Sequence, residues 1–195
     1  MINKMRIIVG ISGASGITYA VKALELLRAA NVETHLVISK AGERTLAHEV
    51  DCSLSELKAM ADHTYSNKDI GAAIASGSFC TAGMLIAPCS IKTMSEIHTG
   101  VTSSLLTRAA DVILKERRRL VLMVRETPLH TGHLRTMTGL SEIGAIIAPP
   151  MPAFYTKPDS LDEMVSQTVG RILDLFDIKC ENVKRWGEDL PTAPS

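Results

Sequence analysis

The stretch RIIVGISGASG, which runs from Arg6 to Gly16, decides the fold. Its first part, Arg6–Ile11, is rich in β-branched residues, which predicts a short buried strand. The five residues from Ser12 to Gly16 are all small, as a tight turn at a strand end requires. Apolar residues then recur at helical spacing over Ile17–Ala30, and Glu33–Ile38 (ETHLVI) again resembles a strand. This order of strand, glycine turn, helix and strand predicts the opening unit of a nucleotide-binding parallel sheet.

The same alternation continues along the chain. Further strands are predicted at Met84–Ala87, Leu120–Val124 and Ala145–Ala148, and helices at Ser104–Arg118, Leu134–Ile143 and Leu161–Phe176, with one more opening at Ser39 and Lys40. The segment Gly71–Gly83 is rich in Ala, Ser and Gly, and we expect it to include a flexible loop. From about residue 178 the chain is a polar tail, which we expect to be mobile or to form a subunit contact. We therefore predict one α/β domain over residues 1–195, with an open parallel sheet and helices on both faces.

The composition limits what the protein can bind. Hydrophobic residues make up 46% of the 195 residues but aromatic residues only 4%, which indicates an aliphatic core. Lys plus Arg and Asp plus Glu each number 21, so no global field draws the protein to nucleic acid or to a membrane. The densest basic run, from Lys115 to Arg119, is interpreted as the C-terminus of a helix. An anionic ligand must therefore be bound by a local group of cations.

Cysteines and histidines give no sign of a metal site. The four cysteines (Cys52, Cys80, Cys89 and Cys180) lack C-x-x-C spacing, which favours reduced thiols in a cytoplasmic protein. His130 and His133 could share a metal at i and i+3, but no Cys or carboxylate cluster joins them. We interpret them as a surface pair where a loop meets a helix. Met1 to Met5 is too short and polar for a signal peptide, and no apolar run reaches membrane-spanning length. A cytoplasmic location is expected.

Open parallel sheets bind ligands beyond the carboxyl ends of their strands. Five segments follow the predicted strands and are expected to converge on one site: Ser12–Gly16, Ser39–Lys40, Pro88–Thr93, Arg125–His130 and Pro149–Tyr155. In the first, the spacing G-x-x-G-x-x-G from Gly10 to Gly16 would let the backbone approach a ligand, and the following helix would offer free amides to a phosphate. The spacing is neither the dinucleotide fingerprint nor a Walker motif, and a simple tight turn remains the alternative.

Two other segments carry side chains suited to an anion. Ser90, Lys92 and Thr93 supply donors for a flavin or a phosphate, although Ser90 would also serve as an ordinary helix N-cap. The neighbouring Cys89 has no evident partner base and is interpreted as a buried thiol. Arg125 can bind phosphate through two nitrogens, and the adjacent Glu126 could move a proton. The alternative for this last pair is an ion pair in a surface loop.

Taken together, seven stretches resemble the UbiX-like flavin prenyltransferases and occur in that family's order over nearly the whole chain. They are VGISGASG (Val9 to Gly16), ISKA (Ile38 to Ala41), PCSIKT (Pro88 to Thr93), LLTRAADVILKERR (Leu105 to Arg118), VRETPLH (Val124 to His130), PAFY (Pro152 to Tyr155) and RWGE (Arg185 to Glu188). The resemblance implies a flavodoxin-like Rossmann fold, bound FMN and assembly of the chain into a homododecamer. It also implies transfer of a dimethylallyl group from dimethylallyl monophosphate to N5 and then C6 of reduced FMN, which supplies prenylated FMN to a UbiD-type decarboxylase.

The resemblance also implies a role for individual residues. The flavin-binding positions fall on Gly13, Ala14, Ser15, Ser39, Ser90, Ile91, Lys92, Thr93 and Arg125. The prenyl-phosphate clamp falls on Lys115, Arg125, Tyr155 and Arg171, with Glu126 alongside and the aromatic Trp186 near the site. Ser15, Glu49 and Glu126 are expected to handle protons. No Asp-rich motif is present, which fits a monophosphate bound by Lys and Arg without a metal ion.

Three other functions are possible. The runner-up by fold is an FMN-dependent cysteine decarboxylase, but such proteins have a catalytic His in the first helix, and Ile17–Ala30 contains none. An FMN-dependent aromatic acid decarboxylase, or its accessory subunit, would bind an acid beside the flavin. A non-catalytic electron carrier would have no use for a second anion clamp.

Overall fold

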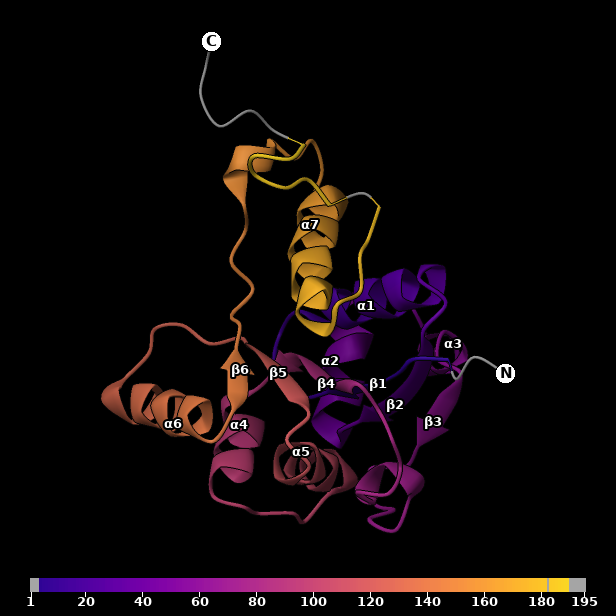
Figure 1. The fold of residues 1–195 in the computed structure, drawn as a ribbon, viewed down its shortest axis with the longest axis vertical. Helices are drawn as coiled ribbons and strands as arrows, with labels where there is room; N and C mark the ends of the chain where they lie inside the picture. Colours follow the sequence, from indigo (N-terminus) through magenta and orange to yellow (C-terminus); the bar gives the residue numbers. More distant parts are fainter. Residues whose placement is uncertain (1–3, 182, 190–195) are drawn as a thin grey trace.

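The computed structural model describes residues 4–181 and 183–189, which contain one six-stranded parallel sheet in the order β3-β2-β1-β4-β5-β6 (Figure 1). The strands are β1 (Arg6–Ile11), β2 (Glu33–Ile38), β3 (His63–Tyr65), β4 (Gly83–Cys89), β5 (Arg119–Val124) and β6 (Ala145–Ile147). The helices are α1 (Ile17–Ala29), α2 (Lys40–Glu49), α3 (Leu54–Ala59), α4 (Ile91–His98), α5 (Leu105–Lys115), α6 (Thr131–Glu142) and α7 (Leu161–Leu173), with short 3-10 turns η1 (Ala73–Ala75), η2 (Phe154–Thr156) and η3 (Asp174–Phe176). The predicted α/β class and open parallel sheet are confirmed.

Two aliphatic layers cover the sheet, one on each face. Alternate residues of β1 face opposite sides: Ile7 and Val9 join the core under α1, α2, α3 and α7, whereas Ile8 joins the core under α4, α5 and α6. In Figure 1, α1 and α7 lie above the sheet and α4, α5 and α6 below it. Because both faces are covered, the strands are nearly continuous apolar runs, as the sequence showed.

Several element boundaries differ from the sequence-based expectation. The helix expected to reach Arg118 ends at Lys115, because the chain turns left-handed at Arg117 (φ 56°). The helix expected from Leu134 begins at Thr131, where the His130 ring caps its first amides. The helix expected to reach Phe176 ends at Leu173 and continues as η3. The elements α3 and β3 were not predicted, and α4 was anticipated only through the alternative that Ser90 is a helix N-cap.

The expected flexible loop before β4 is tied to α5. It contains η1, and the Arg118 guanidinium donates to the carbonyls of Gly77 (2.6 Å) and Phe79 (2.7 Å). Its last expected residue, Gly83, already belongs to β4.

An arm extends away from the sheet. After β6 the chain leads out to η2 and returns through α7, and residues 183–189 come back beside η2 (Figure 1). The expected polar tail therefore packs in part: Ile178, Cys180 and Val183 are buried against α7. The terminal Pro-Thr-Ala-Pro-Ser lies outside the described residues.

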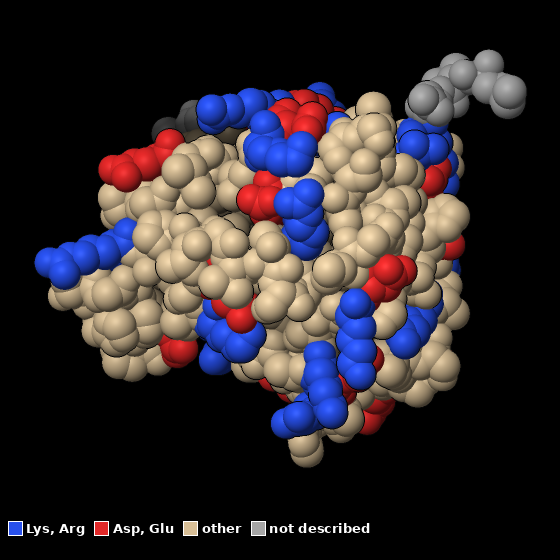
Figure 2. Space-filling view, turned by 90° about the horizontal axis from the view of Figure 1, so that it is seen from below, with Lys and Arg blue, Asp and Glu red and all other residues tan. Residues whose placement is uncertain are grey.

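The surface agrees with the balanced composition. On the face seen in Figure 2, most Lys and Arg side chains lie near Asp or Glu, and uncharged surface separates these groups. Within residues 4–181 and 183–189, no helix has the length and apolar character needed to cross a membrane.

Candidate active site

A cavity of about 270 Å³ lies where the carboxyl ends of the central strands meet the helices that follow them. Its lining comes from three such junctions, from Asn67 and from the start of α5: Gly13, Ser39, Lys40, Ala41, Asn67, Ser90, Lys92, Thr93, Glu96, Ser104, Leu106 and Thr107. Five of the residues expected to bind the flavin therefore lie together: Gly13, Ser39, Ser90, Lys92 and Thr93.

Three helix N-termini meet at this cavity. Ser39 caps α2 by accepting the Gly42 amide (3.0 Å), and Ser90 caps α4 by accepting the Thr93 amide (3.3 Å). The third helix, α5, differs because its first amides are not free. Asn67 accepts the amides of Leu105 and Leu106. The first amides of α2 and α4 have no acceptor within their helices, so both helices present donors and a positive dipole end to an anion.

Ser12 fixes the geometry between two of these junctions, and the sequence analysis did not single it out. Its side chain is fully buried, donates to the carbonyl of Pro88 (2.8 Å) and accepts the Ser90 amide (2.7 Å). A hydroxyl directly after a buried strand was the available signal. Ser12 therefore ties the end of β1 to the start of α4.

The side chain of Glu49, the last residue of α2, lies at the N-terminus of α1. Its carboxylate accepts the amides of Gly16 (2.8 Å) and Ile17 (3.0 Å). Burial alone would raise the pKa of Glu49, but hydrogen bonds from Ser15, Ile17 and Gly16 and the charge of Arg125 hold it below its ordinary value. The expectation that α1 offers free amides to a phosphate is therefore wrong, and an anion fits better on the α2 and α4 side of Gly13.

Arg125 lies close to this group and is available to a ligand. Its backbone amide donates to the carbonyl of Cys89 (3.0 Å), which places it beside the β4–α4 junction. The expected alternative, an ion pair with Glu126, is absent, and Arg125 has no ion pair with any described residue. Tyr19 also belongs to this group: burial raises the pKa of its phenol, and the nearby charge of Arg125 opposes that shift.

Two reactive-looking side chains have structural roles. Cys89 is fully buried, and burial raises the pKa of its thiol to about 12, which leaves it un-ionised and unsuited to act as a nucleophile. His130 accepts the amides of Gly132 (3.0 Å) and His133 (3.4 Å) through Nδ1. That nitrogen is therefore engaged as a helix cap, in agreement with the loop-to-helix interpretation of the pair.

Two cations of the expected phosphate clamp lie at the other end of the sheet. Lys115 ends α5, forms an ion pair with Glu116 and lies against Gly77, just before β5 begins. Arg171 is in the last turn of α7 and forms an ion pair with Asp174. Strands of six or seven residues at about 3.3 Å per residue separate that end from the cavity by roughly 20 Å. One chain does not bring these cations to its own cavity.

Tyr155 and Trp186 lie on the arm. Their rings meet edge to face at 5.5 Å between centroids. Beside them, Met151, Phe154 and Leu161 expose more than 70% of their surface. A second cavity of about 550 Å³ lies between η2, α7 and the C-terminal segment. Four carboxylates line it against the single lysine Lys184, which disfavours a phosphate: Asp162, Glu163, Glu181 and Asp189.

Comparison with known proteins relates this arrangement to one family. The family model described as Flavoprotein matches residues 1–174. A curated relative from Salmonella typhimurium, "Flavin prenyltransferase UbiX", is 62% identical over 174 residues, which are 89% of this chain and 92% of the relative.

Solved structures agree with the sequence match. The crystal structure of AnUbiX (PadA1) in complex with FMN and dimethylallyl pyrophosphate superposes with a TM-score of 0.94 at 48% identity and covers 95% of this chain and 98% of that one. A dodecameric FMN-dependent Ubix-like decarboxylase from Escherichia coli O157:H7 gives a TM-score of 0.91 at 46% identity, covering 93% and 99%.

Proposed function

This chain belongs to the flavoprotein family and, within it, to the flavin prenyltransferases, and we propose that it transfers a dimethylallyl group from dimethylallyl monophosphate to reduced FMN. The observation that carries this proposal is the cavity at the carboxyl ends of β1 and β4, where the N-termini of α2 and α4 converge. It supplies the anion-binding donors that FMN needs, at the place where open parallel sheets bind their ligands. The product, FMN prenylated at N5 and C6, would serve a UbiD-type decarboxylase.

The residues around the cavity fit the phosphate of FMN. The first amides of α2 and α4, with the hydroxyls of Ser39, Ser90 and Thr93, would hold the phosphate next to Gly13. Ala14, Ser15, Ile91 and Arg125 would contact the rest of the flavin. The backbone at Gly13 approaches α2 so closely that a β-carbon would lie 2.3 Å from Cβ of Ala41, which keeps this wall of the cavity free of side chain.

The clamp for the prenyl phosphate would be assembled from more than one copy of the chain. Lys115 and Arg171 lie about one strand length from the cavity of their own chain, and Tyr155 and Trp186 lie on an arm with exposed apolar residues. Arm residues of one copy and cations of another could meet at the cavity of a third in a large homo-oligomer, for which we propose a dodecamer. The assembled clamp would bind the phosphate that leaves as the allylic C–O bond breaks.

Removing a clamp cation should separate binding from catalysis. Lys115→Ala or Arg171→Ala should leave FMN affinity unchanged, because neither residue lines the cavity of the chain. Each should raise the activation barrier of prenyl transfer by about 2–4 kcal/mol, which slows the reaction roughly 30- to 1000-fold. Turnover at the wild-type rate by both variants with saturating dimethylallyl monophosphate would contradict the clamp.

We propose that Ser15, Glu49 and Glu126 move the protons of the second bond formation. Glu49 is ionised and hydrogen-bonded to Ser15, so it can accept a proton when the C6 position loses one. Glu49→Gln keeps an acceptor for the α1 amides but cannot take a proton. It should therefore release phosphate and accumulate the covalent N5 adduct, which absorbance and mass spectrometry would detect.

One assay separates the proposal from its main alternative, an FMN-dependent aromatic acid decarboxylase or its accessory subunit. Protein, reduced FMN and dimethylallyl monophosphate are mixed without oxygen, and the mass of the flavin is measured. A gain of one five-carbon unit, together with activation of a UbiD-type apo-decarboxylase by the product, supports the transferase. Release of carbon dioxide from a hydroxybenzoate or a cinnamate with FMN alone would instead establish the decarboxylase.

We further propose that residues 1–195 form a single domain and that the protein works in the cytoplasm. In support, Cys52, Cys80, Cys89 and Cys180 are all unpaired, as in a reducing compartment. We expect neither a metal ion in the reaction nor a nucleic acid or membrane partner.

A further inference from the structure

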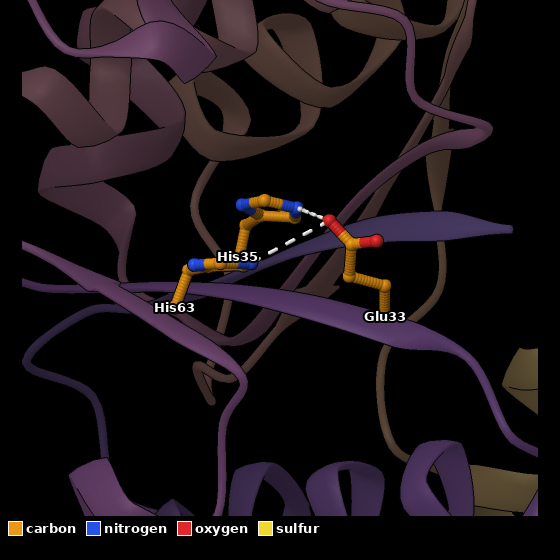
Figure 3. Close-up of side chains that lie close together, drawn as sticks. All are labelled: Glu33, His35 and His63. Atoms are coloured by element: carbon orange, nitrogen blue, oxygen red, sulfur yellow. Dashed lines mark hydrogen bonds and ion pairs between the residues drawn. The ribbon is translucent and has the colours of Figure 1, made fainter. Parts of the chain in front are cut away.

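A compact group of metal-ligating side chains lies at the opposite end of the sheet from the cavity. Glu33 and His35 are two residues apart on β2 and so project from the same face of the sheet. His63 on β3 is the register partner of His35 and projects from that face too. Figure 3 shows both imidazole rings turned toward the Glu33 carboxylate. From this geometry we propose that Glu33, His35 and His63 form a binding site for a divalent transition-metal ion such as Zn²⁺.

The distances between the ligand atoms suit such an ion. Oε1 of Glu33 lies 3.0 Å from Nε2 of His35 and 3.6 Å from Nε2 of His63, and the three ligand atoms lie within 4.8 Å of one another. Ligands at about 2.0–2.1 Å in a tetrahedron are about 3.3 Å apart, so small side-chain rotations would close the site. Two imidazoles and one carboxylate select zinc-like ions over Mg²⁺ or Ca²⁺, which prefer oxygen ligands.

A second set of side chains orients these ligands. The Tyr65 hydroxyl lies 3.0 Å from Nδ1 of His35, and the Phe79 ring meets the edge of His35 at 5.1 Å. With Nδ1 protonated and donating to Tyr65, the His35 lone pair at Nε2 faces the proposed ion. His35 is buried, whereas the side chain of His63 is 54% exposed, so an ion can enter from solvent.

The positive charge of a neighbouring residue, Arg6, disfavours binding of a cation at this site. The Arg6 guanidinium donates through Nε to Oε1 of Glu33 (3.1 Å). It lowers the affinity of the site without blocking either imidazole. Removing this positive charge by Arg6→Gln should therefore tighten Zn²⁺ binding, by roughly three- to tenfold.

The site would stabilise the edge of the sheet. Strand β3 has three residues and pairs only with β2 among the described strands. A metal bound to both strands would link them, so it would act on the folded structure and leave the chemistry at the far end unchanged.

The test uses the full chain without an affinity tag, stripped of metal with a chelator. Zinc sulfate is titrated by calorimetry, and unfolding is followed with and without zinc. We expect one Zn²⁺ per chain and a rise in Tm of about 5–10 °C at a hundredfold excess over Kd. His63→Ala should weaken binding by at least about tenfold, which cuts the rise to about half or less at the same zinc concentration.

Two histidine variants serve as controls. His98→Ala removes an exposed histidine outside the group, and His130→Ala breaks the other histidine pair. Both should bind zinc as the wild type does. If His63→Ala does not fold, His63→Gln replaces it. Absence of saturable binding to the wild type, unchanged binding to the His63 variant, or loss of binding in His130→Ala would each overturn the proposal.

Discussion

The Glu49 carboxylate lies at the N-terminus of α1, where the sequence predicted free amides for a phosphate. The prediction that residues 12–16 form a tight turn before a helix was correct, because small residues after a strand determine that turn locally. The identity of the acceptor was not predictable, since Glu49 is 33 residues from Gly16 along the chain. Ser12 was missed for the same reason: its partners are Pro88 and Ser90.

Glu49 should make the stability of the ligand-free protein depend on pH. Its pKa is lowered in the folded state, so its contribution is present above the ordinary value of 4.5 and is lost as the pH falls through the lowered pKa. At about pH 7, the free energy of unfolding of Glu49→Gln should be about 0.5–1.5 kcal/mol lower than that of the wild type. The difference should shrink as the pH falls from about 7 through this lowered pKa toward about 3. Urea unfolding at both pH values measures it, and Glu43→Gln on the same helix is the control. An equal difference at both pH values would contradict this role.

At the scale of elements, segments with a clear apolar run or helical period were predictable, including the three-residue β6, and most other short segments were not. The strands β1, β4 and β5 are nearly continuous apolar runs, β2 ends in one, and α1 has a clear helical period. Strand β3 has only three residues, too few for any period. Helix α3 is also short, but its capping box, Ser53 with Glu56, was a usable signal that was overlooked.

Gly13→Ala tests the contact between the glycine turn and α2. The new β-carbon would lie 2.3 Å from Cβ of Ala41 and 3.2 Å from its carbonyl carbon, so α2 must move away from the turn. We expect a loss of about 1–3 kcal/mol in the free energy of unfolding and weaker FMN binding. Thermal unfolding and FMN fluorescence titration measure these effects.

Gly71→Ala is the matched control for that variant. A β-carbon at Gly71 meets only a carboxylate oxygen of Asp69, at 3.6 Å, so both measurements should stay at wild-type values. Wild-type stability and affinity in Gly13→Ala would show that the turn does not define the cavity wall.

At the scale of the whole molecule, the two ends of one sheet would contribute residues to two different active sites of the oligomer. This follows from the positions of Lys115 and Glu49 at opposite ends of the strands. The sequence identified both residues by resemblance, yet their separation emerged only once the strand directions were known.

Mixed oligomers test this division. Lys115→Ala and Glu49→Gln should each make little finished prenylated FMN. Co-expressed in equal amounts, they should recover about one quarter of the wild-type activity, because a random site takes both intact residues from different copies with that probability. Product formation by purified mixed oligomers measures the recovery. No recovery would mean that both residues act within one chain.

The exposed apolar residues of the arm should be needed for assembly. Phe154 exposes 72% of its surface, and Phe154→Asp places a charge where a subunit contact is proposed. Light scattering should give a large oligomer for the wild type and a smaller mass for this variant. Ile70→Asp, which alters an exposed apolar residue outside the arm, should leave the mass unchanged. A wild-type mass near that of the 21.0 kDa chain would refute the oligomer.

Burial of the Cys89 thiol affects how readily that thiol is oxidised when oxygen is present. Reduced flavins react with oxygen to give peroxide, which oxidises thiolates far faster than thiols. Because burial raises the pKa of Cys89 to about 12, its thiolate is scarce at neutral pH. The sulfur that ends β4, next to the proposed flavin cavity, therefore resists the oxidant that the flavin would generate. Oxidation of this thiol is therefore not a route by which oxygen would disturb the strand end that supports Ser90.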